Sequence, residues 1–215
     1  MNNNSDNLIT VTGMVIKQEP SDEYDKRIVL LTKEKGKITA FVKGARRQNS
    51  AYGAATNPFA FGKFTLYVGR NSYSLREAVI DNYFEGMRDN IQMAFYGMYF
   101  LEIADYYTRE NNDDADMLRL LFQGVRTLEN PMLSFEFVRA VFEIKSIQIN
   151  GELPPVADHY ANGVKKAVCF ITESPVNKVF SFKLSEDSEK ELIAYAKDIA
   201  SKTYDKKFTS LDLLD

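Results

Sequence analysis

The apolar residues of this chain change their spacing once, near residue 82, and that change limits the folds open to it. Before it, five short apolar runs bounded by turn residues are typical of β-strands. After it, apolar residues recur every three or four positions, which is typical of helices. The pattern predicts an α+β protein with a β domain at residues 1–82 and a helical domain at residues 83–215.

Five short strands are enough to close a small barrel, and the OB fold closes a sheet of this size. Gly13 predicts a bend in the first strand, and the run Gly69-Arg70-Asn71-Ser72 predicts a tight connection between the last two. The expected strands cover residues 8–18, 27–32, 37–43, 61–68 and 72–79.

Residues 44–58, GARRQNSAYGAATNP, separate the third and fourth expected strands and contain almost no apolar anchor. A loop of this length in a compact domain is usually functional or mobile. We expect it to be disordered when nothing is bound to it.

In the second domain, helices are expected at residues 88–110, 116–128 and 132–149, followed by a last helix capped by Ser185. The first of these is apolar around most of its circumference, which predicts a central position. Asn150-Gly151 ends the third, because Gly suits the left-handed position after a helix. The Asn-rich leader at residues 2–7 is expected to be disordered.

Composition limits the cellular setting. The chain has 215 residues, of which 45% are hydrophobic and 27% charged, as in an ordinary globular protein. It contains no apolar run long enough to span a membrane and no secretory signal pattern. The single cysteine excludes an internal disulfide and fits the cytoplasm, where the protein is expected to associate with the nucleoid.

The net charge of −3 hides an asymmetry between the two halves. Residues 1–80 carry 12 Lys and Arg against 7 Asp and Glu, a net charge of +5, whereas the remainder carries −8. A basic N-terminal part followed by an acidic remainder indicates two modules with different partners.

Enzymatic chemistry has little support. His159 and Cys169 are the only residues of their kinds, and we interpret these counts as evidence against His-based triads, Cys–His dyads and multi-His metal sites. The chain has neither a P-loop nor a G-x-G-x-x-G motif. We therefore expect no enzyme activity, metal or cofactor, and interpret His159 as a surface residue and Cys169 as a buried thiol.

The basic segment at residues 26–47, KRIVLLTKEKGKITAFVKGARR, is the strongest functional signal. Two strand-like runs form a hairpin that leads into the basic loop KGARR, an arrangement suited to phosphates of an extended polyanion. A solvated hairpin with a charged tip is the competing interpretation, since charged turns are common. Among the aromatic residues, Tyr67 is expected to point outward with Thr65, where it could stack on a base, whereas Phe41 is expected in the core.

Several segments in order resemble the bacterial RecO family of recombination mediators in the RecF pathway. The resemblance spans nearly the whole chain. It is carried by TVTGMVIK (10–17), EYDKRIVLLTKEKGKITAFVKGARR (23–47), NPFAFGKFTLYVGR (57–70), AFYGMYFLEIADYYT (94–108), LLFQGVRTL (120–128), FEIKSIQINGELP (142–154) and KFTSLDLL (207–214).

The resemblance implies an N-terminal OB-fold domain and a helical C-terminal domain in a DNA repair protein. Such a protein binds single- and double-stranded DNA, anneals complementary strands, contacts the C-terminal tail of the single-strand-binding protein, and loads RecA together with RecR. The DNA-binding residues it implies, together with the stacking candidate, are Arg27, Lys35, Lys37, Lys43, Arg46, Arg47, Lys63, Arg70 and Tyr67.

One departure concerns zinc. Many RecO proteins carry two C-x-x-C pairs in the C-terminal domain, but this chain has HYANG at residues 159–163 where the first pair would fall. One His and one distant Cys cannot complete a tetrahedral site. We interpret residues 152–170 as the remnant of a lost zinc module, stabilised by packing of Leu153, Val156 and Val168.

Two functions therefore compete: a DNA-binding mediator, and a protein-interaction adaptor whose OB-like domain does not bind DNA. Charge reversal at Arg46 and Arg47 separates them, because it should abolish DNA binding only under the first.

Overall fold

The computed structural model describes residues 7–70 and 72–213. The leader expected to be disordered, residues 2–7, lies outside the described residues except for Asn7. The chain forms two compact units: Met1–Glu85 with Ala104–Leu118, and Gly86–Ile103 with Arg119–Asp215. These units interleave in sequence, whereas the predicted domain boundary divides the chain once, after residue 82; that boundary stays a prediction.

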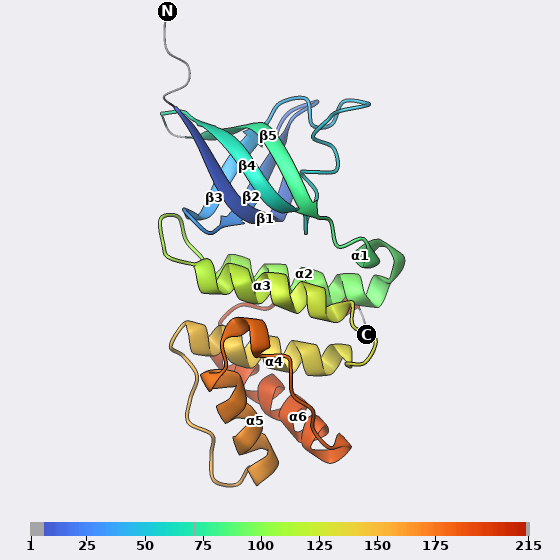
Figure 1. Ribbon diagram of the computed structural model, residues 1–215, viewed down its shortest axis with the longest axis vertical. Coiled ribbons are helices and arrows are strands. Elements are labelled where there is room, and N and C mark those ends of the chain that lie inside the picture. Colours follow the sequence, from blue (N-terminus) through green and yellow to red (C-terminus); the bar gives the residue numbers. More distant parts are fainter. Residues whose placement is uncertain (1–6, 71, 214–215) are drawn as a thin grey trace, which may run out of the picture. The chain divides into compact units, whose positions relative to one another are not determined.

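The first unit contains a closed five-stranded barrel (Figure 1). Around the barrel the strands follow the order β1-β2-β3-β5-β4, with β4 also paired to β1. Only β3 and β5 run parallel, and they pair at Ala40–Tyr73 and Phe41–Ser74. This arrangement confirms the predicted OB-like barrel. The strands are β1 (Leu8–Pro20), β2 (Lys26–Thr32), β3 (Gly36–Val42), β4 (Phe61–Val68) and β5 (Tyr73–Asn82).

The barrel interior is filled by alternating strand residues, including Phe64 and Leu66 of β4, which point inward as expected. The predicted bend at Gly13 stays a prediction; the register shift of β1 lies between Val15 and Lys17. Gly13 is required for another reason, because a Cβ there would clash with the backbone oxygen of Leu31. Glycine is needed where the two backbones approach this closely.

The helices are α1 (Gly86–Asp89), α2 (Ile91–Tyr107), α3 (Ala115–Leu128), α4 (Phe135–Ile149), α5 (Asn162–Glu173) and α6 (Glu186–Thr203), with short 3-10 turns η1 (Val176–Lys178) and η2 (Ser210–Leu213). The helix expected at residues 88–110 is interrupted at Asn90. Its side-chain oxygen accepts a hydrogen bond from the Met93 N–H (3.0 Å) and so caps a new helix.

Two expected helix ends are confirmed and one helix was missed. Gly151 has a φ of +74° after α4, and the Ser185 hydroxyl accepts a hydrogen bond from the Ser188 N–H. Helix α5 was not predicted, because Ala161 at its start makes no side-chain capping hydrogen bond and leaves no start signal in the sequence.

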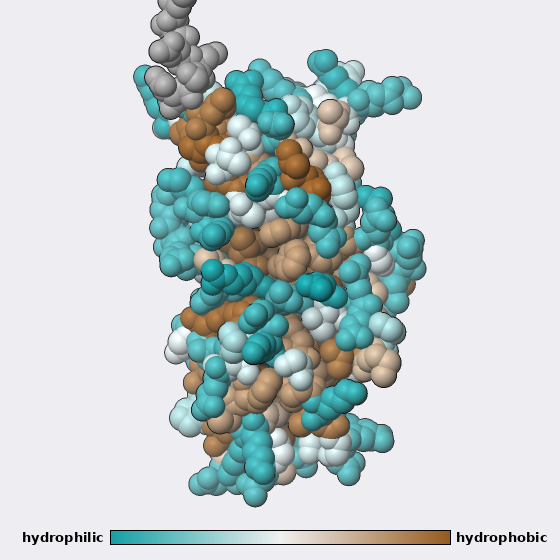
Figure 2. Space-filling model, viewed as in Figure 1, coloured by the Kyte–Doolittle hydropathy of each residue, from teal (hydrophilic) through white to brown (hydrophobic). Residues whose placement is uncertain are grey.

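In the second unit, α4 packs against α5 and α6, and its Phe142 ring stacks on Phe100 of α2 with centroids 4.0 Å apart. Gly124 of α3 faces the same ring: a Cβ there would lie 2.7 Å from Phe142 Cδ2. Figure 2 shows mainly hydrophilic side chains on the face in view, with apolar patches between them.

Candidate nucleic-acid interface

The outward side chains of the barrel form rows that cross several strands. Glu19 of β1 pairs with Arg27 of β2, which pairs with Phe41 of β3. The same row continues through Ser74 of β5 to Tyr67 of β4. Because the inward residues alternate with these, one outer face carries both cations and aromatic rings.

A second row contains Lys17, Val29 and Thr39 on β1, β2 and β3. Phe41 is 39% exposed, so the expectation that it belongs to the core is wrong. Its neighbours Ala40 and Val42 face the barrel interior, as does Ile38 of the same strand. From the sequence alone, the Phe41 ring is predicted to lie in the core. Only the register of β3 shows that it points outward.

Arg27 is held by an acid on the same face. Its guanidinium and the Lys17 ammonium (2.7 Å) both bind the Glu19 carboxylate. Hydrogen bonds from Lys17 and then Arg27 lower the pKa of Glu19 to about 2. Arg27 therefore contributes less free positive charge to this surface than its exposure suggests.

Lys37 is also neutralised. Its Nζ donates to the backbone oxygen (2.6 Å) and the carboxylate (2.8 Å) of Asp105 near the end of α2. Both residues belong to the first unit. The sequence offered no signal for this pair, because 68 residues separate its members.

The loop that follows β3 carries Lys43, Arg46 and Arg47, all exposed. It is fixed at its start: the Gly44 N–H donates to the Asp25 carboxylate (2.8 Å), and Gly44 has a φ of +66° that favours glycine. Arg46 donates to the Asp22 backbone oxygen (3.2 Å). The turn between β1 and β2 thus positions the basic loop.

Two further contacts hold this loop, one to the same turn and one to the first residue of β2. The Arg47 guanidinium lies 5.5 Å from the centre of the Tyr24 ring. The Lys26 ammonium donates to the Thr56 hydroxyl (3.2 Å) and the Asn57 side-chain oxygen (3.3 Å). Burial, and then the charge of Arg46, lower the pKa of Lys26.

Residues 44–58 differ from the expected disordered loop. Successive backbone hydrogen bonds close turns along the segment, including Ser50 N–H to Arg47 O and Thr56 N–H to Tyr52 O, both 3.1 Å. Ala45 and Ala55 are buried, and the Tyr52 hydroxyl donates to the Arg76 backbone oxygen (2.7 Å). Buried alanine side chains therefore fix the loop to the barrel, although the sequence suggested no apolar residue that could do so.

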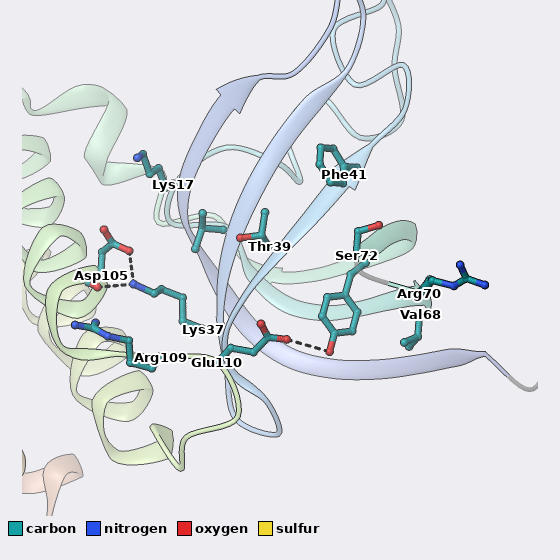
Figure 3. A pocket seen from close by; sticks show the side chains of 13 residues that line it. Lys17, Lys37, Thr39, Phe41, Val68, Arg70, Ser72, Asp105, Arg109 and Glu110 are labelled. Atoms are coloured by element: carbon teal, nitrogen blue, oxygen red, sulfur yellow. Dashed lines mark hydrogen bonds and ion pairs between the residues drawn. The ribbon is translucent and has the colours of Figure 1, made fainter.

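A groove of about 670 Å³ runs along the outer side of β3, where Lys37, Thr39 and Phe41 line it. Strands β1, β2 and β3 contribute to it, together with the connection between β4 and β5 and the end of α2, all in the first unit. Figure 3 shows Lys37 directed at Asp105, and Glu110 directed at the tyrosine hydroxyl of the groove. Its charged lining residues are Lys17, Lys37, Arg70, Arg109, Asp105 and Glu110.

The remaining expected DNA-binding residues lie at different positions on the barrel. Arg70 is exposed at the groove, and Lys35 is half-buried in the turn between β2 and β3. Tyr67 is half-buried in the first row, with the Arg76 guanidinium 5.2 Å from its ring centre. Lys63 lies elsewhere, between Thr12 of β1 and Val79 of β5.

Sequence reasoning left four residues out of this surface: Lys17, Tyr24, Tyr73 and Arg76. The alternation of β1 was a usable signal for Lys17, since Ile16 is apolar and buried beside it. The other three depend on strand register and turn geometry.

The comparisons with known proteins agree with this architecture. The model described as recombination protein O N terminal matches residues 7–84, and the model described as recombination protein O C terminal matches residues 88–206. The chain belongs to the RecO family. RecO proteins are non-enzymatic recombination mediators in DNA repair, which agrees with the expectation that this chain is not an enzyme.

Relatives named DNA repair protein RecO differ in how much of their length aligns. The protein from Alkaliphilus metalliredigens is 30% identical over 68% of this chain, a region covering 60% of that relative, less than two thirds. The protein from Acetivibrio thermocellus is 24% identical over 97% of this chain and 96% of its own length. The protein from Clostridium perfringens is 23% identical over 96% and 97%.

The region interpreted as a lost RecO zinc module, residues 152–170, includes most of α5 (Asn162–Glu173). His159 is exposed, as expected, and its ring lies 4.2 Å from that of Tyr160. Cys169 is exposed, so the prediction of a buried thiol is wrong. The helix buries Val168 and Ile171 and turns Cys169 toward solvent, although the whole run is apolar. The absence of zinc stays a prediction.

In the described part of this RecO chain, no group of three or more His, Cys, Asp or Glu side chains could hold a metal. Leu153 and Val156 are half-buried near the start of the region, and Val168 is buried. No helix among residues 7–70 and 72–213 is long and apolar enough to span a membrane.

The second unit has a pocket of about 470 Å³ whose lining combines aromatic and basic side chains. At its base the buried Glu143 carboxylate accepts hydrogen bonds from the Tyr99 hydroxyl (2.5 Å) and from Arg139 Nε (2.9 Å). Burial, and then the charge of Glu143, raise the pKa of Tyr99. The lining includes Arg139, Lys197, Lys206, Lys207, Tyr204 and Phe208.

Proposed function

We propose that this RecO-family chain binds single- and double-stranded DNA, anneals complementary strands, and acts with RecR to load RecA. One observation carries the DNA-binding part. The outer face of β2 and β3 carries an exposed aromatic ring, Phe41, and leads at one end into an ordered loop with three exposed cations, Lys43, Arg46 and Arg47.

These cations suit the phosphate backbone better than the bases. Lysine and arginine neutralise phosphates without reading sequence, and each contact releases a counterion. About five or six contacts would give a log–log dependence of affinity on salt with a slope of about −4 for single strands. Phe41 and Tyr67 supply rings on which bases can stack, at about 1–3 kcal/mol each.

Annealing follows from the same surface. Two complementary strands repel each other through their phosphates, and the cations of the basic loop screen that repulsion. Because the phosphate contacts leave base edges free, the bases of the two strands can pair while both backbones are held.

The test is a fluorescence-anisotropy titration of labelled single-stranded DNA at several salt concentrations. We expect steeply salt-dependent binding that is lost in the Arg46→Glu/Arg47→Glu double variant. Lys63→Glu is the matched control, because Lys63 is exposed on the same barrel but lies between Thr12 and Val79, away from the basic loop. Binding retained by the double variant and lost in the Lys63 variant would move the site to the other face.

The protein-interaction adaptor remains the second candidate, and two ion pairs favour it. Arg27 binds Glu19 and Lys37 binds Asp105, so two of the expected DNA-binding cations already have acidic partners. Absence of binding to either single- or double-stranded DNA at low salt would leave the adaptor as the function.

We further propose that the basic pocket of the second unit binds the acidic C-terminal tail of the single-strand-binding protein. Lys197 and Lys206 are exposed at its rim, and Tyr204 and Phe208 provide apolar contact. Affinity for a peptide with the tail sequence should fall at least tenfold in a Lys197→Glu/Lys206→Glu variant. Lys183→Glu, an exposed change outside the pocket, should leave it unchanged.

A further inference from the structure

The groove along β3 contains a carboxylate that has no role in binding phosphates. Glu110 is exposed, lies just beyond α2, and lines the groove with Asp105. Asp105 already binds the Lys37 ammonium. Within the described residues, the Tyr73 hydroxyl is the one side-chain group that hydrogen-bonds the Glu110 carboxylate, at 3.5 Å.

The groove also has the parts needed to hold a nucleotide. Its volume of about 670 Å³ lies within the range of small-ligand sites. Phe41 and Tyr73 provide aromatic surface, and Arg70 is an exposed cation on the connection between β4 and β5. The β2–β3 face and this connection are where OB folds generally bind oligonucleotides.

We propose that Glu110 reads the Watson–Crick edge of a base held in this groove and favours guanine. This inference rests on the proposed binding of single-stranded DNA and concerns the preference of that site. An ionised carboxylate can accept hydrogen bonds but cannot donate them, so it pairs with base edges that present donors.

The four bases differ in that respect. Guanine presents adjacent N1–H and N2–H donors that a carboxylate can accept together. Cytosine and adenine present one amino group each beside an acceptor nitrogen, and thymine presents a single N3–H between two carbonyl oxygens. Glu110 therefore attracts guanine most and thymine least, because only guanine satisfies both carboxylate oxygens at once.

Tyr73 acts as a positioning residue for this contact. Tyr73 is the first residue of β5 and pairs with Ala40 of β3. Its hydroxyl donates a hydrogen bond to one carboxylate oxygen of Glu110. Burial, and then the charge and hydrogen bond of Glu110, raise the pKa of Tyr73, so the hydroxyl stays protonated and can donate. The hydroxyl contact thus holds the carboxylate at the groove, and each carboxylate oxygen keeps a lone pair that can accept a hydrogen bond from a base.

The experiment compares two thymine-rich oligonucleotides of equal length and charge that differ only in carrying guanine or inosine at the same positions. Inosine lacks the N2 amino group and keeps everything else. We expect the full-length protein to bind the guanine oligonucleotide about fivefold more tightly, because inosine keeps the N1–H and loses one hydrogen bond to the carboxylate. In Glu110→Gln, whose amide keeps a single acceptor oxygen, the ratio of affinities should fall toward one.

The quantity to compare is the ratio of the affinities for the guanine and inosine oligonucleotides. The affinities themselves are not informative, because removal of any acid strengthens binding to both oligonucleotides. Glu77→Gln is the matched control: it removes an exposed carboxylate of the same barrel, opposite Thr65, and should keep the ratio. Equal, salt-dependent binding of both oligonucleotides by the wild type would overturn this inference and leave the proposed function standing. A ratio unchanged in Glu110→Gln would overturn it as well, and binding of neither would remove the proposed function itself.

Discussion

The Asp25 carboxylate accepts a 2.8 Å hydrogen bond from the backbone N–H of Gly44. Asp25 lies in the turn between β1 and β2, and Gly44 opens the basic loop after β3. One hydrogen bond therefore joins an acidic turn to the segment proposed to bind DNA. An acid here supports a basic surface by fixing its geometry.

Removal of this carboxylate tests that role. In Asp25→Ala the Gly44 N–H loses a charged acceptor, a contact worth about 1.5–3 kcal/mol when well formed. We expect lower stability in urea denaturation and faster hydrogen exchange at residues 44–47. Asp22→Ala is the control: the Arg46 guanidinium binds the backbone oxygen of Asp22, so that contact survives the change. Unchanged exchange in Asp25→Ala would show that other contacts hold the loop.

Glu19 is expected to restrain DNA binding. Its carboxylate binds both Lys17 and Arg27, so Glu19→Gln frees two cations for phosphates. Affinity for single-stranded DNA should rise about two- to fivefold, the range of an exposed ion pair, and its salt dependence should steepen. Anisotropy titrations measure both. A weaker affinity would mean that Glu19 orients Arg27 for binding.

The same residue makes stability depend on acid. The folded protein lowers the pKa of Glu19 from 4.5 to about 2, so its ionised form is favoured by folding. The stabilisation is fully present above about pH 4.5 and is lost as pH falls toward 2. Urea denaturation of wild type and Glu19→Gln should differ at neutral pH and converge in this acidic window. A difference that grows on acidification would contradict the lowered pKa.

Gly124 is expected to be essential for packing of the second unit. In Gly124→Ala the new methyl carbon would lie 2.7 Å from Phe142 Cδ2, in a ring stacked on Phe100. Overpacking of this kind costs about 1–3 kcal/mol, which should lower the thermal midpoint by several degrees. Gly151→Ala is an informative comparison, because its Cβ would meet nothing within 4 Å and its cost comes from the φ of +74° alone.

Cys169 should react in the folded protein. The thiol is exposed, and a hydrogen bond to Glu173, together with that residue's charge, raises its pKa. A disulfide reagent should therefore modify it without denaturant, slowly at neutral pH and faster as the pH rises. Glu173→Gln should accelerate the reaction near neutrality by increasing the thiolate fraction. A thiol that reacts only after unfolding would contradict its position on α5.

The barrel and most helices were predictable because their signals are local. Alternation placed Phe64 and Leu66 inside, and Asn150-Gly151 and Ser185 marked helix ends. Phe41 and Cys169 were misplaced for one reason: apolar character was taken as burial, and only strand register or helix rotation decides which way a side chain points. The cations of the candidate interface were visible in the sequence, but the partners of Arg27 and Lys37 were not, since ion pairs across strands and distant segments leave no local pattern.

The turns that order residues 44–58 have a thermodynamic consequence. Segments that fold on binding lose conformational entropy at that moment and show a large negative heat-capacity change. Here the loop already has its hydrogen bonds and its buried alanines before any partner arrives. Association should therefore resemble the meeting of two preformed surfaces, with a binding enthalpy that changes little with temperature and a binding free energy dominated by the release of counterions.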